Sequence, residues 1–261
     1  MLAGLWRYRS FVLGMARREF EARYRGSALG TVWAIASPLA MIFIYTVVFG
    51  HMMRARLSGV DDPLAYGIFL CAGVLTWNMF AEILQRCVNV FVDQGNLLKK
   101  MSFPRATLPA IVVVSGIVNF AIVLGILLVV LVLVGRFPGW PLVAFVPLLA
   151  LHLSFALGAG VALGVVNVFF RDVAHALAVM LQFWFWFTPI VYPLDLVGEP
   201  VRSVIALNPL TGLALGYQAI LVHGQWPVWS ALVAPLAVSL FTLWLARYTF
   251  RTLAGEMADH L

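Results

Sequence analysis

Six long windows without a charged residue divide this sequence, and they constrain its fold more than any other feature. They cover residues 26–53, 63–81, 106–135, 137–170, 173–194 and 203–246. A helix that crosses a membrane needs about 20 mostly apolar residues. The first five windows each fit one such helix, and the sixth is long enough for two. The windows therefore predict an all-α integral membrane protein with six or seven spans.

Composition excludes the other broad classes of protein. The chain has 261 residues, of which 63% are hydrophobic and 11% are charged, and its mean hydropathy is +0.98. Soluble domains are about 45–50% apolar and about 25% charged. The chain has two cysteines, Cys71 and Cys87, which are too few for a disulfide scaffold, and we interpret both as small buried apolar residues.

The basic residues choose between six and seven spans. With six spans and a cytoplasmic N-terminus, the inner segments contain Arg7, Arg9, Arg17, Arg18, Arg23, Arg25, Arg86, Lys99, Lys100, Arg105, Arg171, Arg247 and Arg251. The outer segments then contain Arg54, Arg56, Arg136 and Arg202. Inner loops of membrane proteins are enriched in Lys and Arg. We therefore predict one domain over residues 1–261 with six spans and both termini in the cytoplasm.

The last window is interrupted before its final span. Asn208-Pro209, Gly212 and Gly216 break the stretch 203–223. Non-helical backbone at membrane depth is tolerated only where protein or a water-filled cavity covers it. We interpret 195–225 as an extracytoplasmic re-entrant segment with a pair of short helices, followed by a last span near 228–246.

Two segments are expected on the cytoplasmic side. Residues 1–25 form an amphipathic segment, with a helix over 5–24 that lies in the membrane interface. Residues 86–107 form the longest inner loop and contain both lysines, Lys99 and Lys100, with Pro104 ending a short helical pattern. By composition alone, both segments are typical of basic lipid anchors.

The chemistry of an enzyme is absent from the sequence. The acids lie at span ends or in loops, and His152, well inside a span, is expected to be neutral and bonded to a neighbouring helix. There is no HExxH motif, no Cys/His metal spacing and no GxxxxGK[ST] phosphate loop. If ATP drives this protein, another chain must bind it.

Five stretches, in order, resemble the permease subunit of type-2 ABC exporters for O-antigen, capsule or teichoic-acid polysaccharides. They are YRGSALGTVWAIASPL (24–39), AGVLTWNMFAEIL (72–84), NLLKKMSFPRATLP (96–109), RDVAHALAVMLQFWFWFTPIVYP (171–193) and ALNPLTGLALGYQAIL (206–221). The resemblance implies a bacterial inner-membrane exporter of a polysaccharide, such as O-antigen on a polyprenyl carrier. It also implies two copies of this chain, two ATPase subunits that bind ATP and Mg, and no cofactor or nucleic acid on this chain.

The resemblance also assigns the two cytoplasmic segments to ATPase contact. The expected coupling residues are Arg17, Arg18, Asp93, Asn96, Lys99, Lys100 and Arg105. Their basic groups can pair with acids on a partner.

Aromatic residues are the candidates for the substrate pathway, because sugar rings have apolar faces that stack on aromatic planes. The candidates in the fifth window are Phe183, Trp184, Trp186, Phe187 and Tyr192, and by family analogy Tyr45 and Trp77 join them. The alternative is an aromatic belt at the membrane interface. Consecutive aromatics cover every face of a helix, so periodicity does not select the face that lines the pathway.

Two other functions remain open at this stage. The chain could be the permease of an exporter for a small amphiphile or drug. A membrane glycosyltransferase or scaffold of the same pathway is the alternative from another class, although the sequence lacks the acidic clusters that such an enzyme needs.

Overall fold

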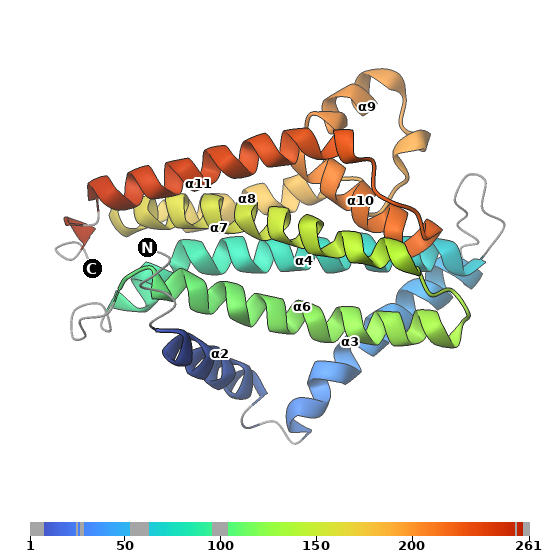
Figure 1. The fold of residues 1–261 in the computed structure, drawn as a ribbon, viewed down its shortest axis with the longest axis horizontal. Helices are drawn as coiled ribbons and strands as arrows, with labels where there is room; N and C mark the ends of the chain where they lie inside the picture. Colours follow the sequence, from blue (N-terminus) through green and yellow to red (C-terminus); the bar gives the residue numbers. More distant parts are fainter. Residues whose placement is uncertain are drawn as a thin grey trace.

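A computed structural model describes residues 8–24, 26, 29–52, 63–95, 104–253 and 255–257. Within these ranges the chain forms helices and no strand (Figure 1). Five helical stretches there are long and apolar enough to cross a bilayer: Gly30–Val48, Leu64–Asp93, Thr107–Leu133, Trp140–Phe169 and Trp229–Leu253. The prediction of an all-α integral membrane protein is confirmed.

The chain begins with a helix that packs on the outside of the bundle. Helix α2 (Arg9–Tyr24) is the helical part of the predicted amphipathic segment, and residues 1–7 and 25 lie outside the described residues. Val12 and Ala16, one turn apart, are buried on the face of α2 that contacts the bundle. A 3-10 turn, η1 (Gly30–Val32), then leads into α3 (Trp33–Ile44) and the π-helix η2 (Tyr45–Met52).

Helix α4 (Pro63–Asp93) is the centre of the bundle, and it is longer than the sequence indicated. It packs against α6 (Thr107–Leu133), α7 (Phe145–Phe169), α8 (Asp172–Trp186) and α10 (Pro209–His223). Residues 86–93, the first part of the segment predicted as the cytoplasmic coupling loop 86–107, continue this helix. The charges of Glu82 and Arg86 ended the apolar window, but both are paired on the surface of α4 and do not end the helix.

Small residues allow α7 to lie close against α4. A Cβ atom added to Gly160 would lie 2.5 Å from the Cβ of Cys87, and one added to Gly164 would lie 2.5 Å from the carbonyl oxygen of Cys87. The last helix, α11 (Val233–Leu253), lies along α7, where Gly158 faces Thr242 and Leu243. Close approach at small residues is typical of helix packing in membranes.

The fifth window forms a shorter helix than expected. Helix α8 has 15 residues, about 22 Å at 1.5 Å per residue, and it ends beside the middle of α4, where Trp184 meets Phe80. Pro189 explains this end, because the residue before a proline is sterically disfavoured in the helical region and proline itself donates no hydrogen bond. The chain continues through residues 187–198 without an α-helix, apart from the 3-10 turn η4 (Leu194–Leu196).

The predicted break before the last span is present as a bent pair of helices. Helix α9 (Glu199–Ala206) and α10 meet at 95° around Asn208, and α9 stands at the edge of the bundle (Figure 1). Helix α10 then runs back along α4 and α7 towards the end of the bundle where α6 finishes, since Gly224 lies beside Pro138.

Candidate functional site

Four charged side chains fasten α2 to α4, and we call them the ionic clasp: Glu19, Arg23, Glu82 and Arg86. Arg86 Nη2 lies 2.6 Å from Glu19 Oε2, and Arg23 Nη2 lies 2.7 Å from Glu82 Oε1. A weaker contact of 3.4 Å joins Arg86 to Glu82 one turn away. The two pairs therefore alternate in sign, with an acid and a base on each helix.

A third helix completes the clasp with neutral donors. The hydroxyl of Ser115 on α6 donates to Glu19 Oε2 at 2.6 Å, and the amide of Asn119 donates to Glu82 Oε2 at 3.1 Å. Each carboxylate thus has a cation from one helix and a neutral donor from another. Sequence reasoning missed this site, because it placed the acids at span ends and did not pair them. A usable signal existed on α4, where Asn78, Glu82, Gln85 and Asn89 share one helical face.

The predicted coupling residues that the structure describes lie on this side of the bundle. Arg17 and Arg18 are exposed on α2, with Arg17 paired to Glu21 at 2.8 Å. Asp93 is exposed at the end of α4, and Arg105 lies in the turn before α6. Asn96, Lys99 and Lys100 lie outside the described residues. The end of α4 and the start of α6, which the clasp joins to α2, therefore lie at the same end of the bundle (Figure 1).

The aromatic residues of α8 divide between two faces. Trp184 turns inward, where its ring packs against Phe80 and Phe155 at centroid distances of 5.6 and 6.1 Å. Trp77, 9% exposed, lies in the same layer against Phe185 at 5.6 Å. In contrast, Phe183, Trp186 and Phe187 point outward with 64%, 63% and 55% of their surface exposed. Phe183, Trp186 and Phe187 are therefore the more exposed aromatic candidates of this segment, while Trp184 is half-buried.

Asn208 joins the end of α8 to the corner between α9 and α10. Its amide nitrogen donates to the carbonyl of Phe187 at 3.0 Å and to the hydroxyl of Thr188 at 2.9 Å. Its amide oxygen accepts from Trp184 Nε1 at 2.9 Å and from the backbone N–H of Leu210 at 3.0 Å. The sequence indicated a break at Asn208, but it did not show that the side chain holds two helix ends together.

The non-helical chain after α8 is satisfied by neighbouring side chains. Gln218 of α10 donates to the carbonyl of Pro189 at 2.9 Å, and Tyr66 of α4 donates to that of Val191 at 2.7 Å. The hydroxyl of Tyr192, a predicted pathway residue, donates to the carbonyl of Trp186 at 2.9 Å. Irregular backbone inside a membrane protein requires such partners. Tyr192 therefore caps the C-terminal end of α8 by satisfying a backbone carbonyl.

An open groove of about 400 Å³ runs between α8 and the α9–α10 corner. Phe183 and Phe187 form one wall, Val204 and Leu207 form the other, and Asn208 lies between them. The groove thus combines aromatic planes with one carboxamide, a chemistry that suits both sugar rings and lipid chains.

Two further predicted residues lie away from this groove. Tyr45, half-buried at the start of η2, faces a separate cavity between α3, α4 and α6. His152 is buried and stacks on Phe80 at 5.4 Å, but neither ring nitrogen has a hydrogen-bond partner among the described residues. The expected bond from His152 to a neighbouring helix is therefore wrong.

This arrangement defines a class of protein. It is a multi-pass α-helical membrane protein with a short bent helix pair before its last span and the ionic clasp at one end. The chain belongs to the ABC-2 type transporter family, whose model matches residues 11–222. It is 34% identical over 259 residues to an O-antigen export system permease protein of Myxococcus xanthus, with 98% of this chain and 97% of that protein covered.

More distant relatives cover less of the chain. An O-antigen export system permease protein of Klebsiella pneumoniae is 28% identical, with 80% of this chain and 79% of that protein covered. A polysialic acid transport protein of Escherichia coli is 24% identical, with 74% of each chain covered.

Proposed function

We propose that this chain is the membrane-spanning permease of an ATP-driven exporter for a polysaccharide, such as an O-antigen carried on a polyprenyl lipid. The observation that carries this proposal is the 34% identity to an O-antigen export permease over almost the whole length of both proteins. The names of these relatives give O-antigen and polysialic acid as the exported molecules, and both are hydroxyl-rich polymers.

The energy for transport comes from a separate subunit. Two copies of this chain assemble with two ATPase subunits, which hold ATP and Mg, and this chain binds no cofactor. The ATPase docks through Arg17, Arg18, Asp93 and Arg105 at this end of the bundle. It also contacts Asn96, Lys99 and Lys100, which follow Asp93 in the sequence. Because the clasp joins α2, α4 and α6 there, a push from the ATPase would move three helices together.

This docking end faces the cytoplasm of the bacterial inner membrane. Arg171 joins α7 to α8 at that end, and Arg251 lies there too, since Phe250 packs beside Phe91 at 6.0 Å near the end of α4. Arg136, in contrast, follows α6, and Arg202 lies in α9. Both are on the other side. Enrichment of arginine on one side supports a cytoplasmic location for that side and for both termini.

The polymer contacts the outward face of α8. Phe183, Trp186 and Phe187 offer exposed aromatic planes beside the groove at the α9–α10 corner. Trp77, Trp184 and Tyr192 support this face from behind: the first two through ring packing, and Tyr192 through its bond to Trp186.

The test is to delete the gene in its source cell and restore it. We expect the deletion to remove the polymer from the cell surface and to leave it accumulated inside, and the wild-type chain to restore export. Reversal of Lys99 and Lys100 to Glu should lower export while the chain still inserts. Unchanged surface polymer in the deletion strain, combined with loss of efflux of a small amphiphile, would contradict the proposal and favour the drug exporter.

A further inference from the structure

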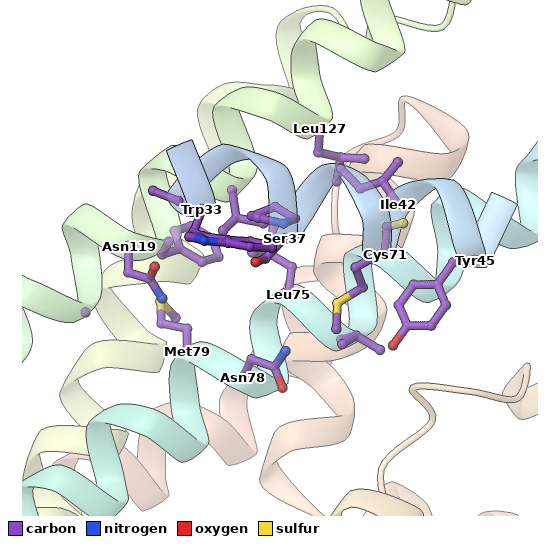
Figure 2. A pocket seen from close by; sticks show the side chains of 17 residues that line it. Trp33, Ser37, Ile42, Tyr45, Cys71, Leu75, Asn78, Met79, Asn119 and Leu127 are labelled. Carbon is purple, nitrogen blue, oxygen red and sulfur yellow. The ribbon is translucent and has the colours of Figure 1, made fainter. Parts of the chain in front are cut away.

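A cavity of about 260 Å³ lies between α3, α4 and α6, away from the aromatic groove. Figure 2 shows side chains from all three helices around it, with Trp33 and Ile42 on α3, Leu75 and Asn78 on α4, and Asn119 on α6. Trp33, Ser37 and Asn78 are exposed, so the cavity is open along one side. We call it the α3 slot.

Three neutral polar side chains of the slot lie towards one end. Ser37, Asn78 and Asn119 lie towards the side of the bundle where the clasp is, and Asn119 itself donates to Glu82 of the clasp. Towards the other end the walls are mostly apolar, with Ile42 and Leu127 among them, and Tyr45 and Cys71 also lie there (Figure 2). No charged side chain is among the described residues that line the slot.

The size of the slot fits a single hydrocarbon chain. On α4 it extends from Cys71 to Met79 and on α6 from Gly116 to Leu127, which is about 12–16 Å at 1.5 Å per residue. An extended hydrocarbon chain advances about 1.2 Å per bond, so about 10–13 methylenes span this length. The length of the slot therefore suits one extended chain.

Helix α3, which forms one wall of the slot, is mostly exposed. Ile42 is the buried residue of α3, while Leu39, Met41, Phe43 and Ile44 are exposed, so the helix has little protein packed against it. A chain in the slot would supply the missing contacts between α3 and the pair α4–α6.

We infer that the α3 slot binds one acyl chain of a membrane phospholipid, with the ester end of the chain at Ser37, Asn78 and Asn119. A hydroxyl-rich sugar does not match the mostly apolar walls, and phospholipid acyl chains are the hydrocarbon that the surrounding bilayer offers to the open side of the slot. The bound lipid sets the position of α3 and contacts the clasp through Asn119. This role is independent of the polymer that the exporter carries.

The test counts phospholipids on the full-length chain, purified with its partner subunits in a mild detergent and examined by native mass spectrometry. Wild-type protein should retain one phospholipid per chain more than the Ala34→Phe variant, because the phenyl ring fills the slot from α3. The matched control is Ala237→Phe on the exposed face of α11, which should retain as much lipid as the wild type.

A second measurement separates a filled slot from a damaged fold. Stripping the lipid should lower the thermal midpoint of the wild type and of Ala237→Phe, but not that of Ala34→Phe, in which the ring replaces the chain. If Ala34→Phe does not fold, Val123→Phe fills the slot from α6 and carries the same expectation. Equal lipid retention in wild type and filled variants, or retention of a polyprenyl lipid in place of a phospholipid, would overturn the inference.

Discussion

The carboxylate of Glu19 in α2 lies 2.6 Å from the guanidinium of Arg86 in α4, although 67 positions separate the two residues. This pair fixes a peripheral helix to the central helix of the bundle. The second pair, Arg23 with Glu82, has the opposite polarity, so α2 cannot slide along α4 without bringing like charges together. The ionic clasp thus holds α2 beside α4 and α6, the two helices that precede and follow residues 96–103 in the sequence.

The first prediction concerns the contribution of the ionic clasp to the free energy of unfolding. Glu19→Gln and Arg86→Met should each destabilise the chain by about 1 kcal/mol, because the pair is only partly shielded from solvent. The double variant should cost less than the sum, since the second change removes a contact that is already lost. Thermal unfolding of the four proteins in one detergent measures this. Arg17→Met, whose pair with Glu21 is largely exposed, is the control with almost no cost. Strictly additive costs would show that the two residues are not coupled.

The second prediction concerns Asn208. Asn208→Asp should lower the free energy of unfolding by about 2–3 kcal/mol, because a carboxylate cannot donate to the carbonyl of Phe187 or to Thr188. For a chain of this size that corresponds to a fall in the thermal midpoint of very roughly 5–10 °C. Gln182→Ala, exposed on α8, is the control and should leave the midpoint unchanged. An unaltered midpoint in Asn208→Asp would mean that the corner is held by other contacts.

The third prediction separates the two faces of α8. Phe183→Ala and Trp186→Ala should reduce export several-fold with little change in thermal stability, because both side chains are exposed. Trp184→Ala should instead lower stability by about 3 kcal/mol or more, since it leaves a hole beside Phe80 and frees the oxygen of Asn208. Surface polymer and thermal midpoints, measured on the same variants, give both readouts. Export unaffected by both outward changes would remove α8 from the pathway.

The fourth prediction concerns the contact between α7 and α4. Gly164→Ala should destabilise the bundle by about 1–3 kcal/mol, because the new Cβ would meet a backbone oxygen that cannot turn away. Gly125→Ala on α6 is the matched control, since a Cβ there meets nothing within 4 Å. The midpoint of Gly125→Ala should equal or exceed that of the wild type, because alanine favours the helix over glycine. Equal midpoints for the two variants would contradict the packing seen here.

The fifth prediction tests the orientation in the membrane. In a background with Cys71→Ala and Cys87→Ala, a cysteine at Glu199 should react with an impermeant thiol reagent on intact spheroplasts. A cysteine at Glu256 should react only after the cells are opened. Both side chains are exposed, so access to the reagent depends on the side of the membrane alone. Labelling of Glu256→Cys from outside would contradict the cytoplasmic location of the C-terminal end.

The sequence alone determined which segments are helices in a membrane, and for α6 it did so almost to the residue. The window 106–135 became Thr107–Leu133, because apolar length is a local property that the lipid environment selects directly. It also indicated the bend at Asn208-Pro209, since proline and its neighbours act on the adjacent backbone.

Tertiary structure alone decided which residues meet. The true length of α4 depended on the ion pairs that Glu82 and Arg86 form with α2, some 60 residues earlier in the chain. Local hydropathy, in contrast, predicts that the helix ends at these two charges. The inward turn of Trp184 and the outward turn of Trp186 depended on Asn208 and Phe80, which lie on other helices. In an apolar environment nearly every face of a helix is hydrophobic, so periodicity carries little information about partners. Hydrogen bonds, ion pairs and close packing between distant segments supply that information, and they exist only after the helices have assembled.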